Sequence, residues 1–303
     1  MNVVEKTDAD LYRATTLSTA LTVPKFRDDI PFGLGATGRV FLDIPQYLAE
    51  NKYRKPIGVS KSPFQYMHKT EREYYEWAIH QNLTNGAAIK NYIKGYREGC
   101  PSWTRPDSCP AQAELANGLQ GNDAVLLVDV GGGFGQDLQN FYTNNPSVRH
   151  VSILQDRPTV LSSIAPDSLH SRISTMPRDF FTQQPVRGAH AYHLHSILHN
   201  WDDTHYRTTL GHLRDAMTPG YLKLLIFENV VPDRGAHWQM TRLDWLMMAT
   251  CVALERTERQ WREFVGSVGF KVRRIWTMDE TTENLIEAVT EGERRGEDVM
   301  RQG

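Results

Sequence analysis

Cysteine, net charge and long apolar runs are all scarce in this sequence, and each scarcity excludes a class of protein. The 303 residues include three cysteines, Cys100, Cys109 and Cys251, which cannot all pair with one another and show no metal-ligand spacing. This scarcity favours a reducing intracellular compartment over a disulfide-rich secreted protein. The formal net charge of −2 gives no electrostatic reason for binding nucleic acid or a membrane surface.

Apolar segments are also too short for a membrane protein. No apolar run approaches the roughly 20 residues that a membrane helix needs. The first residues, MNVVEKTDADLYR, carry charge where a secretory signal requires an apolar stretch. With 40% hydrophobic and 23% charged residues, the composition is that of a globular protein with a real core. We therefore expect a cytoplasmic protein.

One stretch, LLVDVGGGFGQDL at residues 126–138, reads as a buried strand, a glycine-rich turn and a helix start. Asp129 is the single carboxylate at the end of the strand, and Gly131, Gly133 and Gly135 follow it. Glycine lets the backbone turn sharply and come close to a ligand. The spacing resembles a dinucleotide-binding turn without matching the stricter G-x-G-x-x-G pattern. A tight turn without a ligand is therefore an equally good interpretation.

From residue 124 onward, strand-like and helix-like segments alternate. The helix-like stretch Thr204–Met217 is closed by Pro219 and Gly220. This alternation predicts an α/β fold with a parallel sheet that helices cover on both faces. Ligands of such sheets bind beyond the carboxyl ends of the strands, near the switch in strand order. The predicted strands are Ala124–Val130, His150–Leu154, Arg172–Met176, Ala189–Leu194, Leu222–Val230 and Lys271–Thr277.

Acidic residues follow the second and third predicted strands. Asp156 ends the second strand, where a carboxylate suits the two hydroxyls of a ribose. Because Pro158 favours a helix start, Asp156 is also compatible with a simple N-cap. Asp179 and Phe180 follow the third strand, and a carboxylate followed by an aromatic ring suits an adenine. The ordered pair of positions indicates a nucleotide-like ligand better than either position does alone.

Three histidines, His193, His195 and His199, mark the end of the fourth predicted strand, in HLHSILHNWDD. An imidazole at a strand end faces the ligand crevice and titrates near neutrality, which suits proton removal. For any single histidine a structural role is the commoner one. On a strand that runs into a loop the three rings do not converge, and no Cys or Glu ligand is near. We therefore expect no metal site.

The first 119 residues have a different character. Residues 1–55 contain short strand-like pieces, Asn2–Val4 and Leu11–Thr15, and a glycine-rich turn at residues 32–35. Residues 64–103 are rich in aromatic side chains, which most simply pack together in a helical layer. Prolines 101, 106 and 110 predict a loop before a helix around Ala111–Leu119. At the other end, the charged segment 291–303 reads as a solvated or frayed tail.

Taken in order, these motifs resemble those of the S-adenosylmethionine (SAM)-dependent O-methyltransferases of the caffeic-acid type, and most closely the fungal branch acting on secondary metabolites. The resemblance covers nearly the whole chain and includes a preceding helical segment in SPFQYMHKTEREYYEW and NYIKGYREGCPSW. The motifs are LVDVGGGFGQDL, LQDRPTV, RDFF, LHSILHNWDD, LLIFENVVPD and ALERTERQWREFVGSVGF.

The resemblance implies a Rossmann-like, doubly wound methyltransferase sheet preceded by a truncated winged-helix and helical region. Residues 1–55 are expected to be the remnant of a winged-helix dimerisation domain. Residues 56–119 are expected to form a helical linker that lines the substrate site, and residues 120–303 the SAM-binding domain. The implied reaction moves the methyl group of SAM to a hydroxyl of a small secondary metabolite and leaves S-adenosylhomocysteine (SAH), without a metal.

The resemblance also implies a role for each matching residue. His199 occupies the position of the general base, and Glu228 and Glu255 match the two acids that orient it. A phenol, with a pKa of about 10, needs such a base at neutral pH. Residues expected to hold the cofactor are Asp129, Gly131, Gly133, Asp156, Asp179, Phe180 and His195. Residues expected to line the acceptor pocket are Trp238, Asp244, Met247, Met248 and Asn200, although plain core packing is an equal interpretation for the methionines.

Two departures from the family pattern bear on these expectations. Family members usually carry further N-terminal helices that interlock two subunits, so a homodimer is expected only in weakened form. Asn200 stands where Asp is usual, which either lowers the basicity of His199 or reflects a different acceptor. Two alternatives stay open: a SAM-binding relative that catalyses a dehydration or pericyclic reaction, and a non-catalytic subunit. Retention of His199, Glu228 and Glu255 together favours methyl transfer.

Overall fold

The computed structural model describes residues 3–56, 58, 61–80, 88, 91, 101–105, 115, 119, 124–219, 222–278, 281 and 283–290. The chain forms two compact units: residues 1–100 with 244–253, and residues 101–243 with 254–303. The helix predicted around Ala111–Leu119 falls almost entirely outside the described residues, and the charged tail 291–303 falls wholly outside them. The predicted three-part division of the chain stays a prediction.

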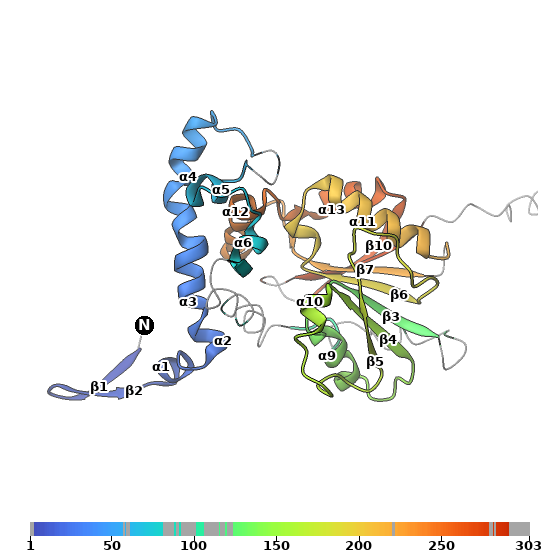
Figure 1. The fold of residues 1–303 in the computed structure, drawn as a ribbon, viewed down its shortest axis with the longest axis horizontal. Coiled ribbons are helices and arrows are strands. Elements are labelled where there is room, and N and C mark those ends of the chain that lie inside the picture. The colour runs from blue at the N-terminus through green and yellow to red at the C-terminus, as the bar shows by residue number, and fades with distance from the viewer. Residues whose placement is uncertain are drawn as a thin grey trace, which may run out of the picture. The chain divides into compact units, whose positions relative to one another are not determined.

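The larger unit is built on a seven-stranded sheet with the strand order β10-β11-β7-β6-β3-β4-β5 (Figure 1). The strand β11 is antiparallel to both of its neighbours, and the other six strands run parallel to one another. The strands are β3 Val125–Val130, β4 Val151–Asp156, β5 Ile173–Pro177, β6 Ala191–His195, β7 Lys223–Glu228, β10 Phe270–Thr277 and β11 Asn284–Thr290.

All six predicted strands are present within a few residues of their expected bounds. The seventh, β11, is not predicted from the sequence, although all seven of its residues are buried. It carries Asn284 and Glu287, and these polar residues interrupt the apolar pattern by which a buried strand is predicted. The Oε1 atom of Glu287 lies 3.2 Å from Nζ of Lys223 on β7, so this buried charge is paired. The expected doubly wound α/β fold is confirmed, with one antiparallel strand added.

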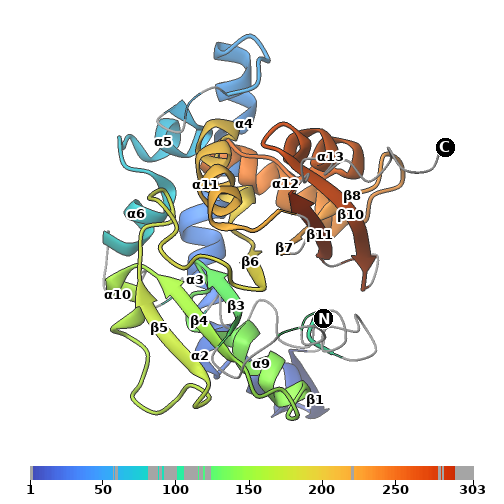
Figure 2. The same cartoon turned by 90° about the vertical axis from the view of Figure 1, so that its right-hand side faces the viewer.

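Helices cover both faces of this sheet (Figures 1 and 2). On one face α11 (Asp203–Ala216) and α13 (Glu258–Gly266) pack on Val128 and Val130, and on the other α9 (Gln136–Asn144) packs on Leu126 and Leu127. The helix predicted at Thr204–Met217 is thus α11, and the side chain of Asp202 caps its first turn. Shorter elements of the larger unit are α10 Pro158–Leu161, η3 Leu198–Asn200, β8 Val230–Val231 and β9 Arg256–Thr257.

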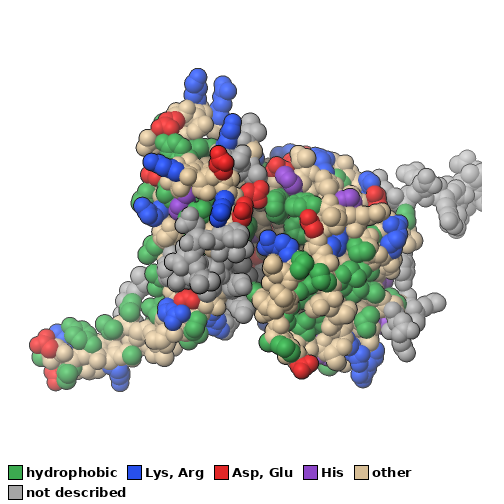
Figure 3. Space-filling model, in the orientation of Figure 1, with side chains coloured by type: hydrophobic (Ala, Val, Ile, Leu, Met, Phe, Trp, Pro, Cys, Tyr) green, Lys and Arg blue, Asp and Glu red, His purple; other side chains and the backbone are tan. Residues whose placement is uncertain are grey.

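The smaller unit begins with an antiparallel hairpin of β1 (Val4–Asp8) and β2 (Leu11–Ala14), near the two strand-like pieces predicted there. Hydrophobic side chains are exposed along this hairpin (Figure 3): Leu11 is 59% and Tyr12 62% accessible. Its assignment as a winged-helix remnant stays a prediction. The helices are α1 Thr16–Ala20, α2 Pro24–Arg27, α3 Asp29–Phe32, α4 Arg39–Glu50, α5 Pro63–His68 and α6 Tyr74–His80.

The prediction of a glycine-rich turn at residues 32–35 is wrong. The chain is helical there, because the π-helix η1 (Gly33–Gly38) joins α3 directly to α4. A Cβ at Gly38 would lie 2.7 Å from the carbonyl oxygen of Gly33, so the wide π turn itself requires a residue without a side chain.

The predicted packing of aromatic side chains is confirmed for Phe64, Tyr74 and Trp77 but not for Trp103. Phe64, which is fully buried, meets the rings of Tyr74 and Trp77 edge-on, with both centroids 5.1 Å away. Trp103 belongs instead to the larger unit and packs near Phe141, with centroids 6.2 Å apart. The helix α12 (Trp238–Cys251) begins in the larger unit and ends in the smaller one. Among the described residues, every helix is too short or too polar to cross a bilayer.

Candidate active site

The candidate site lies at the carboxyl ends of the central strands. From β3 the chain proceeds to β4 and β5 on one side, and it then crosses back to β6 on the other side of β3. Such a reversal is the switch point at which α/β sheets bind ligands. The glycine turn after β3, Asp156 at the end of β4 and the segment after β6 that contains His199 all follow strand ends at this edge.

The glycine turn requires its glycines. Gly131, Gly133 and Gly135 have φ angles of +72°, +60° and +78°, which residues with a Cβ rarely adopt. At Gly132 a Cβ would lie 2.2 Å from Oδ2 of Asp129, so the backbone passes directly over that carboxylate. The amides of Gly131 and Gly132 both donate to the carbonyl oxygen of Gln155, at 2.8 and 3.2 Å.

Asp129 is fully buried beneath this turn. Its Oδ1 lies 2.9 Å from Nδ1 of His193, which is also fully buried and whose ring centroid is 4.9 Å from that of Trp103. The buried charge of Asp129 is therefore matched by a hydrogen-bonded imidazole. The first of the three predicted histidines thus has a structural partner, and Asp129 supports the turn from below.

Asp156 reaches the same turn from β4. Its Oδ2 accepts a hydrogen bond from the Gly133 amide at 2.9 Å, and its Oδ1 accepts one from the Arg157 amide at 2.7 Å. Burial raises the pKa of Asp156, and these two hydrogen bonds oppose that rise. The alternative role as an N-cap is wrong, because Arg157 occupies the N-cap position of α10 and no side chain caps this helix.

Asp179 and Phe180 lie in the turn after β5. Oδ1 of Asp179 accepts a hydrogen bond from the Phe181 amide at 3.0 Å, and the rest of this side chain is exposed. Phe180 is half-buried, and its ring lies 3.6 Å from where a Cβ would stand at Gly131. The turn after β5 therefore lies next to the glycine turn, as expected for residues that share one ligand.

His199 is buried in η3 and is held by two acids in different ways. Its Nδ1 lies 2.9 Å from Oε1 of Glu255, a hydrogen-bond distance, and 3.5 Å from Oε2 of Glu228. Oε1 of Glu228 accepts instead from the backbone amide of Leu198 at 2.7 Å and from that of His199 at 3.4 Å. Glu255 thus fixes the imidazole ring, and Glu228 fixes the backbone that carries it. Within the described part of the chain, Nε2 of His199 has no hydrogen-bond partner.

The surroundings make His199 unusually basic. Burial by itself lowers the pKa of the imidazole, since the charged form loses its hydration. The carboxylates of Glu228 and Glu255 outweigh this effect, with a smaller contribution from Glu283, and raise the pKa of His199 to about 9. Burial also raises the pKa of Glu228, which the charge of His199 opposes. Asn200 in place of the usual Asp does not prevent this elevation.

Glu283 and Ser196 are not among the residues predicted from the sequence. Ser196 has a φ of +50°, so the turn between β6 and η3 is left-handed at a residue other than glycine. Its Oγ donates to Oε1 of Glu283 at 3.1 Å, and the same Oε1 lies 3.6 Å from Nε2 of His195. Nδ1 of His195 also pairs with Asp137 in the first turn of α9. No local pattern identifies Glu283, because it precedes β11 and lies 87 residues from Ser196.

Of the residues expected to line the acceptor pocket, Asn200 lies beside His199 and the other four lie on α12. The side chain of Asn200 donates to the carbonyl oxygen of Ser196 at 2.8 Å, so it braces the turn. On α12, Trp238 is 62% exposed and Met247 is buried. Trp238 belongs to the larger unit, whereas Asp244, Met247 and Met248 belong to the smaller one. Their contact with an acceptor stays a prediction.

A seven-stranded, doubly wound sheet with one antiparallel strand, and with acidic residues at successive strand ends around a glycine turn, is typical of SAM-dependent methyltransferases. Within this class the chain belongs to the O-methyltransferase family, whose domain model matches residues 117–271. It is a SAM-dependent O-methyltransferase of small molecules.

Curated fungal proteins resemble the chain over most of its length. Methyltransferase cfoC of Aspergillus candidus is 32% identical over 289 residues, which cover 95% of this chain and 70% of cfoC. O-methyltransferase mpaG of Penicillium brevicompactum is 33% identical over 290 residues, covering 95% of this chain and 72% of mpaG. The chain therefore groups with O-methyltransferases of fungal secondary metabolism.

Two solved structures share the fold and somewhat over a quarter of the sequence. LepI in complex with SAM matches with a TM-score of 0.87 and 27% identity, covering 96% of this chain and 73% of that one. A pericyclic reaction enzyme matches with a TM-score of 0.88 and 27% identity, covering 96% and 74%. Each is a protein that this chain resembles in fold.

The residues at the strand ends fit a SAM molecule. Within the glycine turn, a Cβ at Gly133 would have no heavy atom within 4 Å, so the space beside this residue is open, and the half-buried Asp156 presents a carboxylate beside the turn. The turn after β5 adds an exposed carboxylate and a half-buried aromatic ring. An amino-acid part, a ribose and an adenine each require one of these chemistries.

Proposed function

We propose that the protein transfers the methyl group of SAM to a phenolic hydroxyl of a small secondary metabolite, with His199 as the general base. The observation that carries the proposal is the arrangement of the two imidazole nitrogens. Nδ1 is engaged by Glu255 at 2.9 Å, which leaves Nε2 as the atom that accepts the proton. Two further acids, Glu228 and Glu283, stabilise the imidazolium once it forms.

The cofactor-binding residues act by binding and orienting. Asp129 supports the turn of Gly131 and Gly133, which takes the methionine part, while Asp156 takes the ribose. Asp179 and Phe180 take the adenine. His195 stands between Asp137 and Glu283 and helps to hold the cofactor at the strand end. When bound, SAM supplies an electrophilic methyl group on a sulfonium centre.

The acceptor is held so that its hydroxyl meets Nε2 of His199. We assign this task to Trp238, Asp244, Met247 and Met248 of α12, and to Asn200 beside the base. A phenol is mostly protonated at neutral pH, so proton removal at Nε2 is needed as the oxygen attacks. Most of the rate acceleration then comes from alignment of the reacting atoms by these side chains.

The test is to incubate the purified protein with methyl-labelled SAM and a panel of phenolic polyketides. We expect label in an O-methylated product and formation of an equal amount of SAH. Acceptors whose hydroxyl is already methylated are the matched control, and they should take up no label. A panel in which SAM binds but no acceptor becomes labelled would contradict the proposal.

A second candidate is a reaction that uses the bound cofactor without moving its methyl group. The observation that supports this candidate is the similarity to a pericyclic reaction enzyme, with a TM-score of 0.88. In this case the same incubation gives a changed product without label and without SAH. The pair of buried acids at His199 favours proton removal, and therefore methyl transfer, over this candidate.

A further inference from the structure

Arg178, between β5 and Asp179, is a buried cation that the catalytic proposal does not use. Only 8% of it is exposed, and burial lowers the pKa of its guanidinium. Its hydrogen bonds within the described residues go to neutral acceptors: Nη2 to the carbonyl oxygen of Thr182 at 2.6 Å, and Nη1 to Oε1 of Gln155 at 3.2 Å. Burying a guanidinium in this way costs free energy, so its placement calls for a reason.

Gln155 connects Arg178 to the glycine turn. Its side chain forms a reciprocal amide pair with buried Gln184, with N···O distances of 2.9 and 3.0 Å. Its carbonyl oxygen accepts the amides of Gly131 and Gly132. One residue thus holds the glycine turn through its backbone and the guanidinium through its side chain.

The other contacts of Arg178 reach the remaining cofactor loops. Its own backbone amide donates to the carbonyl oxygen of Asp156 at 2.9 Å. Through Thr182 it holds the end of the turn that begins at Asp179, because the Thr182 amide and hydroxyl both donate to the carbonyl oxygen of Asp179.

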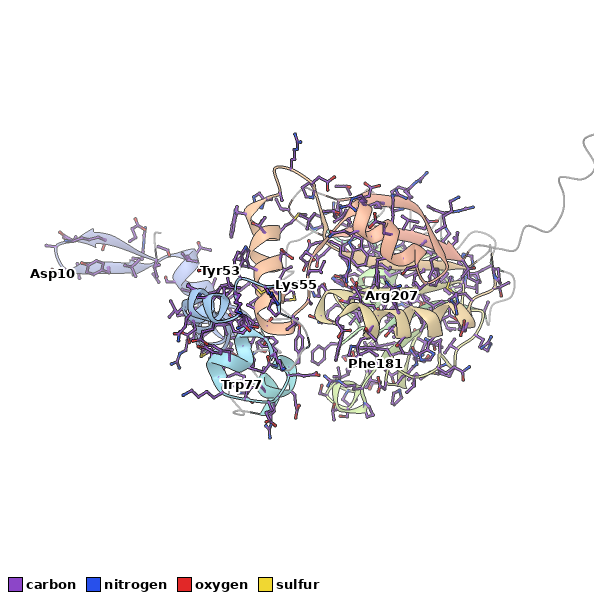
Figure 4. All side chains as sticks on the ribbon, turned by 90° about the horizontal axis from the view of Figure 1, so that it is seen from above. Asp10, Tyr53, Lys55, Trp77, Phe181 and Arg207 are labelled. Carbon is purple, nitrogen blue, oxygen red and sulfur yellow. The ribbon has the colours of Figure 1, made fainter. Side chains whose placement is uncertain are left out.

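The outer side of this turn is anchored separately on α11. Phe181, labelled in Figure 4, has its ring centroid 5.3 Å from that of His205, and its carbonyl oxygen lies 3.0 Å from Nε2 of His212. The turn that carries Asp179 and Phe180 is therefore fixed from outside by α11 and from inside by Arg178.

We propose that Arg178 is a positioning residue for adenine recognition: it sets the turn of Asp179 and Phe180 relative to the glycine turn and Asp156. The inference rests on the proposed cofactor-binding roles of those residues. A guanidinium suits this task because its rigid planar fork fixes the directions in which it donates to two partners, whereas the ammonium group of a lysine is a point charge on a flexible stem. The carboxylate of Asp179 also interacts electrostatically with the guanidinium.

The experiment compares the binding of SAH with that of S-inosylhomocysteine, in which oxygen replaces the adenine amino group, by titration calorimetry. We expect the wild type to prefer SAH. The variant Arg178→Met should lose at least tenfold in SAH affinity and most of this preference, and Arg178→Lys should regain only part of it. The matched control is Arg187→Met, since Arg187 is exposed and also donates to one backbone carbonyl, at 2.6 Å.

A purely structural role for Arg178 would give a different result. It would lower thermal stability and, with it, the affinity for both ligands. The ratio of the affinities for SAH and S-inosylhomocysteine would then stay at the wild-type value in the folded variant. An unchanged ratio would overturn the inference. If Arg178→Met does not fold, Gln184→Met tests the same network and should reduce the ratio in the same direction.

The double variant Asp179→Ala, Arg178→Met adds a second criterion. If Arg178 acts through Asp179, the double variant discriminates no worse than Asp179→Ala alone. A wild type that fails to bind SAH refutes the proposed function, whereas an unchanged preference in Arg178→Met refutes only the present inference.

Discussion

His199 differs from an ordinary surface histidine at both ring nitrogens. Nδ1 is held at 2.9 Å by Glu255, and Nε2 is the atom available to an acceptor. We expect His199→Ala to lower the rate of methyl transfer about 10²–10⁴-fold, the usual contribution of a general base. Cofactor affinity should stay within twofold, because the glycine turn, Asp156 and the turn of Asp179 and Phe180 follow other strands. A methyl-transfer assay together with SAH calorimetry measures the two effects.

The matched control for this variant is His170→Ala. His170 is exposed and stacks on Tyr142 of α9, with ring centroids 4.6 Å apart. It should leave both the rate and the affinity unchanged. Turnover by His199→Ala at the wild-type rate would refute the role of base.

Glu283 influences the same imidazole without touching it. Its carboxylate contributes to the raised pKa of His199, so Glu283→Gln should lower that pKa. Because the base must be neutral to accept a proton, kcat/KM should rise with pH through an apparent pKa near 9 in the wild type. In Glu283→Gln this rising limb should move to lower pH. If the rising limb instead reflected ionisation of the acceptor hydroxyl, its apparent pKa would be the same in the wild type and in Glu283→Gln.

Glu287→Gln provides the comparison for this pH profile. Glu287 lies in β11 only a few residues from Glu283, but it pairs with Lys223 at 3.2 Å and does not contribute to the pKa of His199. Glu287→Gln should leave the apparent pKa of the kcat/KM profile unchanged. Profiles of wild type and Glu283→Gln that coincide would show that Glu283 has no electrostatic role at the base.

The ligand atoms of His199, Glu228 and Glu255 lie within 4.8 Å of one another, a spacing that a divalent ion could also use. The 2.9 Å separation of Nδ1 and Oε1 is, however, a hydrogen-bond length. We therefore expect dialysis against a chelator to leave methyl transfer unchanged. Activity that disappears on chelation and returns with a divalent ion would assign a metal to this cluster.

Among the elements, the glycine turn tolerates the least change. A Cβ at Gly132 would meet Oδ2 of Asp129 at 2.2 Å and Cδ1 of Leu154 at 2.6 Å. Forcing atoms into such a packed space costs about 1–3 kcal/mol. We expect Gly132→Ala to lower the free energy of unfolding by that amount and to weaken SAH binding. Denaturant unfolding and calorimetry measure the two losses.

Gly211 is the matched control within a helix. It lies inside α11, and a Cβ there would have no heavy atom within 4 Å. Alanine should raise stability by about 0.5–1 kcal/mol, because it restricts the unfolded chain. A Gly132→Ala variant as stable as the wild type would mean that Asp129 and Leu154 move aside without cost.

The sequence predicts most elements of the larger unit because their patterns are local. Buried runs such as LLVDV predict strands, and the Pro219-Gly220 pair predicts the end of α11. It does not predict β11, whose Glu287 is neutralised by Lys223, a partner on another strand. In the smaller unit, the sequence also wrongly predicts a turn at residues 32–35, because glycine equally allows a wide helical turn.

At the scale of the whole molecule, contacts between distant segments complete the site. The acids around His199 come from β7, from the segment before β9 and from the segment before β11. A sequence pattern places Glu228 and Glu255 only through the family resemblance. It gives no indication of Glu283 or of the left-handed Ser196, because their pairing exists only after the sheet has brought them together.

This convergence of acids on His199 makes the stability of the protein depend on pH. The folded-state pKa of about 9 lies above the unfolded value of about 6.5, so the folded state binds the proton more tightly. The resulting stabilisation is fully present below pH 6.5 and is lost as pH rises through 9. Burial raises the pKa of Cys251 from 9.0 to about 12, which adds a further loss only above pH 9. Between pH 6.5 and 9 the loss therefore comes from the cluster around His199 rather than from Cys251.

Thermal unfolding across this interval measures the effect. We expect the Tm of the wild type to fall steadily from pH 6.5 to 9, whereas the Tm of His199→Gln changes much less. The difference between the two curves removes contributions that both proteins share, including those of the smaller unit. Parallel curves would mean that His199 titrates alike in the folded and unfolded states. In that case Glu228 and Glu255 orient the imidazole without making it more basic.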